Sequence, residues 1–231
     1  MKKIASILLL VCICLACTAS DDSQPYTPQS YAILSLGDSY TKGEAVCDTC
    51  GYPVQLKDSL ASRFPNQDTF SVNVIAETGW NTKDLINGIN NENPPSTYNL
   101  VTLLIGVNNQ FQNRPFTWFE EDFPQLVNTA TALAKGDKNH VIIISIPDYA
   151  NTGFGQAFGG PIITEEITAY NAYIQNFCIE NDYNFVDAQD LIFMAQTNPE
   201  LIATDNLHPS ELAYSNLVTR LLPLANQILI E

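Results

Sequence analysis

The sequence is poor in positive charge and in histidine. Its 231 residues include ten Lys and Arg against 25 Asp and Glu, which gives a formal net charge of −15 at pH 7, and only two His. Such an acidic surface repels phosphate, so the composition argues against nucleic acid or an anionic membrane surface as a partner. No internal repeat and no low-complexity tract occurs, and the length suits one domain with a substantial core.

The amino terminus has the pattern of an export signal. Met1–Lys3 is basic, and residues 4–15 form an apolar run that is too short to span a membrane comfortably. The run ends in Leu15-Ala16-Cys17, which resembles a bacterial lipobox. That resemblance implies that residues 1–16 are a lipoprotein signal peptide and that Cys17 is lipidated after cleavage; a plain signal peptide cleaved nearby is the alternative.

Lipidation would tie the protein to the cell envelope, in the periplasm or at the outer-membrane surface, without a spanning helix. The membrane is therefore an expected partner through the lipid alone. Residues 17–30 are polar and contain two prolines, so they are expected to form a flexible tether to a domain of residues 31–231.

Cysteine pairs suited to a metal site are missing. Cys47 and Cys50 form a single C-x-x-C, and no second pair completes a zinc site. In an exported protein, a local disulfide between these two residues is favoured over thioredoxin-like redox chemistry. Cys178 lies in a helical stretch and is expected to be a buried thiol. The sequence predicts neither a metal ion nor a cofactor.

Strand-like and helix-like segments alternate along residues 31–231. Strands are expected where apolar residues alternate or run without a break, and helices where they recur every three or four positions. The expected strands are 33–36, 70–76, 100–105, 141–146 and 184–187. The expected helices are 52–64, 83–89, 118–135, a segment from Thr164 and 211–225, while the glycine-rich residues 151–161 are expected to form a flexible loop. This alternation predicts about five parallel strands in a three-layer α/β/α sandwich of flavodoxin-like type.

Polar residues or glycine follow several of these strands at positions where a buried sheet does not need them. Gly37-Asp38-Ser39-Tyr40 follows the first strand, Gly79 the second, and Gly106-Val107-Asn108-Asn109 the third. A fourth segment, Asp205–Pro209, precedes the last helix. Ligands of open α/β sheets bind at the carboxyl ends of the strands, so these segments are expected to lie together. Each motif alone is also compatible with a simple strand-end turn.

Taken in this order, the four segments resemble the nucleophile, glycine, asparagine and final blocks of the SGNH (GDSL-type) hydrolase family. The resemblance spans roughly Tyr31 to the carboxyl terminus and implies a serine esterase with Ser39 as its nucleophile. One position departs from the family pattern. The third block commonly reads Gly-x-Asn-Asp, and here Asn109 stands in place of that Asp. We expect this position to support the loop rather than to do chemistry.

Acyl transfer needs a nucleophile, a base that takes its proton, and donors that stabilise the oxyanion. His208 is the expected base, because His140 directly precedes a strand and should lie at the opposite edge of the sheet. Asp205, three residues before His208, is expected to accept the Nδ1 proton and fix the tautomer. The expected oxyanion donors are the backbone N–H groups of Ser39 and Gly79 and the side-chain amide of Asn108.

Other residues near the motifs have a structural alternative. Asp38 is expected to hold the turn beside Ser39 rather than to act as an acid. Five aromatic residues could line the substrate site or simply pack in the core: Trp80, Phe111, Trp118, Tyr149 and Phe154.

The sequence therefore predicts an exported serine esterase that hydrolyses small carboxylic esters, such as acetyl esters of carbohydrate, through a Ser39–His208–Asp205 triad and an acyl-enzyme. Two alternatives stay open. One is a lysophospholipase or short-chain lipase, which a lipid anchor would place near its substrate. The other is a surface-tethered binding module that keeps the fold without turnover.

Overall fold

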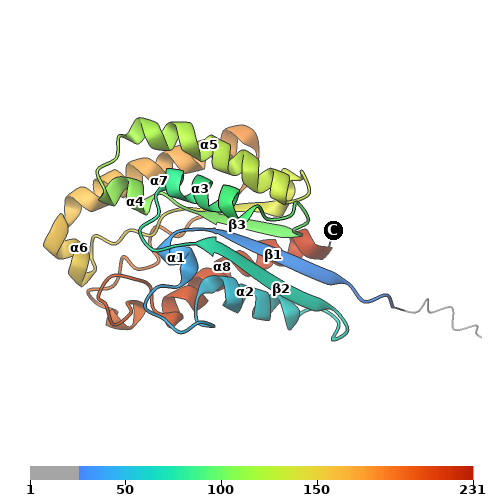
Figure 1. Ribbon diagram of the computed structural model, residues 1–231. Coiled ribbons are helices and arrows are strands. Elements are labelled where there is room, and N and C mark those ends of the chain that lie inside the picture. The colour runs from blue at the N-terminus through green and yellow to red at the C-terminus, as the bar shows by residue number, and fades with distance from the viewer. Residues whose placement is uncertain (1–25, 231) are drawn as a thin grey trace, which may run out of the picture.

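A computed structural model describes residues 26–230 of the chain (Figure 1). The predicted signal peptide, the predicted lipidation site Cys17 and most of the predicted tether lie outside the described residues. The first strand begins at Ser30, where it pairs with Thr69.

The centre of the fold is a five-stranded parallel sheet with the strand order β2-β1-β3-β4-β5. Its strands are β1 (Ser30–Gly37), β2 (Thr69–Ala76), β3 (Leu100–Leu104), β4 (Val141–Ile144) and β5 (Asn184–Val186). Every residue of β3 and β4 is buried, as expected for strands covered on both faces. All five strands agree with the sequence prediction to within a few residues.

Helices cover both faces of this sheet, which confirms the three-layer α/β/α architecture. Figure 1 shows α3, α5 and α7 over one face and α2 and α8 over the other. The helices are α1 (Ser39–Lys42), α2 (Tyr52–Ala61), α3 (Thr82–Glu92), α4 (Val107–Phe111), α5 (Phe116–Leu133), α6 (Gly153–Phe158), α7 (Pro161–Asn181) and α8 (Glu211–Ile230). Short 3-10 turns lie at Lys138–His140 and Pro199–Leu201.

Three of the short helices were not expected from the sequence. The prediction of a flexible loop over residues 151–161 is wrong, because α6 and the start of α7 occupy most of this segment. Thr152 caps α6 by accepting the N–H of Gly155 at 2.9 Å. The four glycines disfavour a helix by intrinsic propensity, and the cap together with packing overrides them. The other two unexpected helices, α1 and α4, begin within the nucleophile and asparagine motifs.

The strand order places the motif segments together. The chain steps from β1 outward to β2 and then crosses back to β3 on the other side of β1. Such a reversal leaves a crevice at the carboxyl ends of the two central strands, here β1 and β3. Ser39 follows β1 and Asn108 follows β3, so the topology brings these two residues to the same crevice.

The junction between β1 and α1 depends on close backbone approach at Gly37. A Cβ added there would lie 2.1 Å from Thr41 Oγ1 and 2.3 Å from the carbonyl oxygen of Leu104 in β3. The backbone angle φ of Gly37 is not in the left-handed region. Glycine is therefore required here because no side chain fits, and not because the backbone makes an unusual turn.

Asp38 forms the amino-terminal cap of α1. Its Oδ1 accepts the N–H of Tyr40 at 3.0 Å, while its Oδ2 is buried and has no hydrogen-bond partner. Burial raises the pKa of Asp38 to about 7, although hydrogen bonds from backbone N–H groups, including those of Tyr40 and Gly106, act in the opposite direction. The geometry agrees with the expectation that Asp38 holds the turn.

We predict that Gly37→Ala lowers the free energy of unfolding by about 3 kcal/mol, because the new methyl group must displace the backbone of β3 or the side chain of Thr41. Urea denaturation followed by circular dichroism measures this loss. Gly51→Ala is the matched control, since its φ is −70° and its added Cβ would meet no atom closer than 3.4 Å. That control should lose no more than about 1 kcal/mol. Equal losses in the two variants would contradict the close-approach argument.

A second prediction concerns the pH dependence of stability. The pKa of Asp38 is higher in the folded chain, about 7, than its ordinary value of 3.8. The folded state thus retains this proton longer than the unfolded chain, so the contribution of Asp38 to stability is full below about pH 4 and is lost as pH rises through about 7. Asp38→Asn keeps an acceptor for the Tyr40 N–H but cannot ionise.

Between pH 4 and pH 8, wild type should therefore lose up to about 4 kcal/mol of unfolding free energy relative to Asp38→Asn. Urea unfolding of both proteins at each pH measures the difference. Parallel stability curves would show that Asp38 does not titrate in this range.

Candidate active site

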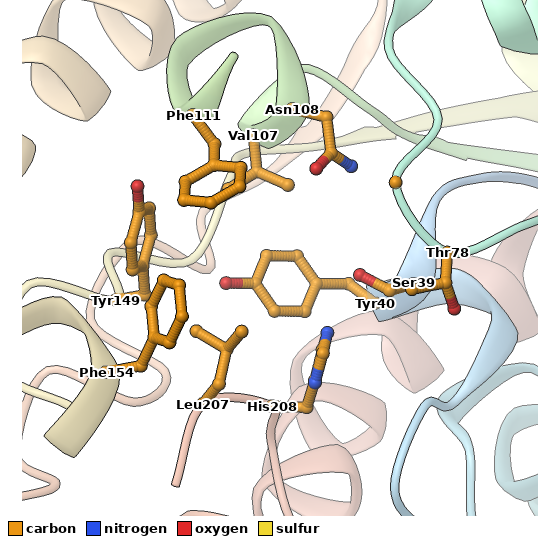
Figure 2. Close-up of a pocket in the computed structure, with 11 residues that line it drawn as sticks. Ser39, Tyr40, Thr78, Val107, Asn108, Phe111, Tyr149, Phe154, Leu207 and His208 are labelled. Atoms are coloured by element: carbon orange, nitrogen blue, oxygen red, sulfur yellow. The ribbon is translucent and has the colours of Figure 1, made fainter. Parts of the chain in front are cut away.

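Ser39 is the first residue of α1 and is almost buried. The N–H groups in the first turn of a helix have no intrahelical partner, so the backbone N–H of Ser39 can serve a ligand. The side chain of Ser39 borders a hollow of about 170 Å³ at the carboxyl ends of the strands (Figure 2). This hollow is lined by Ser39, Tyr40, Thr78, Gly79, Val107, Asn108, Phe111, Tyr149, Phe154, Leu207 and His208.

The hollow unites all four sequence motifs. Ser39 comes from the end of β1, Gly79 follows β2, Asn108 follows β3, and His208 precedes α8. Figure 2 shows the side chains of Ser39, Asn108 and His208 on one side of the hollow and those of Phe111, Tyr149 and Phe154 on the other. The prediction that these segments meet at one sheet edge is confirmed.

His208 and Asp205 form a tightly held pair. His208 Nδ1 lies 2.5 Å from Asp205 Oδ2, while Asp205 Oδ1 accepts the backbone N–H groups of Leu207 and His208, each at 3.0 Å. With Nδ1 donating to the carboxylate, Nε2 is the nitrogen that can accept a proton. Burial opposes ionisation of Asp205, but the hydrogen bonds from His208 and Leu207 outweigh it and hold the pKa of this carboxyl below its ordinary value.

The structure also bears on two alternatives: that Asp205 caps α8, and that His140 is the base. Ser210 caps α8 by accepting the N–H of Ala213 at 3.3 Å, which leaves Asp205 free to bind the imidazole. His140 lies in the 3-10 turn that leads into β4, at the amino end of the sheet, and does not line the hollow. The position of His140 therefore agrees with the sequence-based argument that it is not the catalytic base.

The other two residues expected to supply oxyanion donors, Gly79 and Asn108, line the same hollow. Gly79 has φ +85°, a left-handed conformation that glycine adopts without strain, and an added Cβ would meet no atom within 4 Å. The backbone conformation therefore accounts for a glycine at this position. Asn108 Nδ2 donates to the carbonyl oxygen of Trp80 at 3.0 Å, and an amide nitrogen carries two hydrogens, so one is left for a ligand.

Asn109, the departure from the family pattern, holds the loop in front of α3. Its Oδ1 accepts the N–H of Thr82 at 3.0 Å, and its Nδ2 donates to Thr82 Oγ1 at 2.8 Å. The hydroxyl of Thr82 donates in turn to Asp122 on α5 at 2.7 Å. A carboxylate at position 109 could not donate to Thr82 and would place a second negative charge near Asp122. Asn109 is thus a supporting residue, as expected, and its amide suits the buried Asp122.

The five aromatic residues named from the sequence divide between the site and the scaffold. Phe111, Tyr149 and Phe154 line the hollow. Trp80 packs against Gly88 of α3, and Trp118 lies beneath the ammonium group of Lys83, 4.0 Å from the ring centroid. Neither tryptophan lines the hollow.

Sequence reasoning missed four other lining residues: Tyr40, Thr78, Val107 and Leu207. Each lies next to a residue of the predicted machinery, and this adjacency was the available signal. Sequence reasoning also missed Gln112, which follows α4 and donates a hydrogen bond to the carbonyl oxygen of Gly79. No sequence signal pointed to this residue, because only the tertiary fold brings it to Gly79.

Cys47, Cys50 and Cys178 do not line the hollow. Cys47 and Cys50 form a disulfide, and Cys178 is a buried thiol whose pKa burial raises to about 12. Within residues 26–230, no group of three or more His, Cys, Asp or Glu side chains is arranged to hold a metal ion. None of the helices in the same range is long and apolar enough to cross a membrane.

Known proteins share this fold. A lipolytic protein of the G-D-S-L family from Veillonella parvula is 21% identical, covers 84% of this chain and 97% of its own, and has a TM-score of 0.59. A lipase/acylhydrolase from Enterococcus faecalis is 20% identical, with 85% and 96% coverage and a TM-score of 0.60. A variant of an acetyl xylan esterase from Geobacillus stearothermophilus is 18% identical, with 86% and 95% coverage and a TM-score of 0.57.

No curated protein matches the sequence. The model of the GDSL-like lipase/acylhydrolase family matches residues 35–215, a segment that contains the nucleophile, glycine and asparagine motifs and the final Asp-His segment. The members of this family are hydrolases that act on ester bonds. Because the match covers most of the sequence, this chain belongs to the GDSL-like lipase/acylhydrolase family.

Proposed function

We propose that the protein is an exported serine esterase that cleaves uncharged carboxylic esters through an acyl-enzyme. The observation that carries this proposal is the convergence of Ser39, the His208–Asp205 pair and three oxyanion donors on a single hollow. Nucleophile, base, orienting carboxylate and oxyanion donors are the complete set that acyl transfer needs.

In the first half of the reaction, Nε2 of His208 takes the proton of the Ser39 hydroxyl as Oγ attacks the ester carbonyl. The tetrahedral oxyanion accepts hydrogen bonds from the N–H groups of Ser39 and Gly79 and from the Asn108 amide. His208 then gives the proton to the leaving alkoxide, which departs as an alcohol and leaves Ser39 acylated. Asp205 stabilises the imidazolium that exists between these transfers.

The second half repeats these steps with water in place of the serine hydroxyl. His208 takes a proton from the water, the resulting hydroxide attacks the acyl carbon, and the same donors stabilise the second oxyanion. When the tetrahedral species collapses, Oγ of Ser39 leaves and recovers the proton from His208. The products are a carboxylic acid and the free enzyme.

Two classes of ester are candidate substrates. An acetyl xylan esterase is among the structural neighbours, which supports acetylated carbohydrate as one class. Neighbours named as lipolytic or lipase proteins support lipid esters as the other, in the manner of a lysophospholipase or short-chain lipase. The net charge of −15 disfavours substrates that carry several negative charges. Against a binding module without turnover stands the presence of every group that turnover requires.

Export and lipid anchoring form part of the same proposal. Their support is the basic and apolar amino-terminal sequence that ends at Cys17, the candidate lipidation site. The Cys47–Cys50 disulfide is compatible with an oxidising compartment outside the cytoplasm. The anchor would hold the domain at the envelope surface.

We predict that Ser39→Ala and His208→Ala each lower kcat for p-nitrophenyl butyrate by about 10⁵-fold to 10⁶-fold, because each removes a group that takes part in bond making. Asp205→Asn should cost less, about 10⁴-fold, because the ionised Asp205 orients and stabilises the imidazole without itself taking up the proton. Initial rates of nitrophenol release measure all three.

Two controls accompany this series. His140→Ala removes the other histidine, at the far edge of the sheet, and should retain the wild-type rate. A fluorophosphonate probe should label Ser39 in wild type, which peptide mass spectrometry can locate. Release of nitrophenol at the wild-type rate by Ser39→Ala, or labelling of a different residue, would overturn the esterase proposal.

A further inference from the structure

The walls of the hollow beside Ser39 offer few of the polar groups that bind a carbohydrate. Apart from His208, none of the lining residues belongs to a type that carries a formal charge. Among the remaining polar side chains, Tyr149 donates its hydroxyl to Gln110 at 2.7 Å and Thr78 donates its hydroxyl to Glu44. The Tyr40 hydroxyl points into the hollow without a hydrogen-bond partner among the described residues (Figure 2). Sugar hydroxyls, which require several directed hydrogen bonds, would find few free partners here.

An apolar surface continues outward from this hollow. The rings of Phe111 and Phe154 lie 5.7 Å apart, and Phe154 stacks on Phe158 at 4.2 Å. Phe111 is 44% exposed and Phe158 is 64% exposed, so these three residues, the phenylalanine row, lead from the buried hollow to solvent. Figure 2 shows Phe111 and Phe154 facing the hollow together with Tyr149 and Leu207.

The volume of the hollow sets the size of group it can take. A dry apolar cavity of about 150 Å³ is known to hold one benzene molecule. The hollow beside Ser39 has about 170 Å³, so it has room for an apolar group of about six carbons. The single methyl group of an acetyl ester would leave most of this space unfilled and most of the apolar wall uncovered.

We propose that the preferred substrates are esters of apolar acyl groups of about six carbons, bound in this hollow with the phenylalanine row as its outer wall. The inference rests on the proposed esterase function and names the substrate class of the same site. It selects the lipid-like class over acetylated carbohydrate. Phe111 and Phe154 are then specificity-determining residues, and Phe158 buttresses Phe154 by ring stacking.

The test is a series of p-nitrophenyl esters with two, four, six and eight acyl carbons, assayed with the purified protein. Each methylene that leaves water for an apolar wall should raise kcat/KM by about fourfold. Hexanoate has four more methylenes than acetate, so the expected rise between them is about 250-fold, with little further gain at octanoate. A kcat/KM that is flat, or highest for acetate, would overturn the proposal.

A second arm separates the acyl side from the alcohol side. Ethyl acetate and hexyl acetate share the acyl group and differ only in the alcohol. Their kcat/KM values should lie within about threefold of each other if the hollow holds the acyl group. A rise for hexyl acetate comparable to that expected for the acyl series would overturn the acyl assignment.

Variants test whether the chain-length preference arises from the residues that line the hollow. Phe111→Ala should lower the ratio of hexanoate to acetate kcat/KM by about tenfold, because it removes one apolar wall. Phe193→Ala is the matched control, since Phe193 is similarly exposed, at 40%, and does not line the hollow. A ratio that Phe111→Ala leaves unchanged counts against the proposal. Hydrolysis that persists in Ser39→Ala would overturn the esterase function itself, whereas Ser39-dependent hydrolysis without chain-length preference would overturn the substrate class alone.

A different observation points to a positioning residue. Gln112, at the carboxyl end of α4, donates from Nε2 to the carbonyl oxygen of Gly79 at 2.8 Å, and its Oε1 accepts from Asn81 Nδ2 at 3.0 Å. Asn108, one helical turn earlier on α4, holds the next carbonyl, that of Trp80. The side-chain amides of Asn108 and Gln112 are four residues apart, on the same side of α4, and both donate hydrogen bonds to the loop that contains Gly79.

We infer that Gln112 positions the oxyanion donor of Gly79 by fixing that residue's left-handed backbone. Gln112→Glu tests this geometry, because a carboxylate keeps an acceptor for Asn81 but cannot donate to the Gly79 carbonyl. For both Gln112→Glu and Gln112→Ala we expect kcat to fall by about tenfold to a hundredfold with KM unchanged, since the oxyanion is bound more tightly in the transition state than in the substrate.

Active-site titration with the fluorophosphonate probe distinguishes positioning from a loss of folded protein. The titrated fraction should match wild type in both variants while the rate falls. Gln175→Ala, which changes an exposed glutamine on α7, is the control and should keep the wild-type kcat. A wild-type kcat in Gln112→Glu, or a drop explained entirely by fewer titratable sites, would overturn the assignment.

Discussion

The close contact between the end of β1 and the backbone of β3 is the constraint on which the rest of the site depends. Gly37 permits this contact, because any side chain there would strike the Leu104 carbonyl. The approach brings the starts of α1 and α4 to one crevice and so sets Ser39 beside Asn108. The reversal of strand order at β1 and β3 is a general property of such sheets, whereas the close approach of the β1 end to the Leu104 carbonyl is permitted by Gly37.

Support for the oxyanion donors is built from side-chain amides. Asn108 and Gln112 hold two successive carbonyls of the loop after β2, and Asn109 holds both the N–H and the hydroxyl of Thr82 that follows. An amide can donate and accept at once, which a carboxylate cannot do. This difference gives a physical reason for Asn109: a neutral side chain completes the chain of hydrogen bonds that ends at the buried Asp122.

Much of the fold and the core of the site could be predicted because the signals are local. Buried strands show as apolar runs, and Asp205 and His208 are only three residues apart, so one turn accounts for their pairing. What the sequence could not reveal depends on tertiary contacts. The helix α6 forms against the propensity of its glycines, Trp80 turns away to pack on Gly88, and Gln112 reaches Gly79 across 33 positions of the chain.

The turn that contains Asp205 and His208 joins the orienting carboxylate and the base in a single rigid unit. Asp205 uses one oxygen for the backbone of its own turn and the other for the imidazole. Motion of the surrounding helices therefore cannot separate the two residues. Of the three members of the proposed triad, only the separation between Ser39 and this turn depends on the global fold, so the geometry has a single adjustable distance.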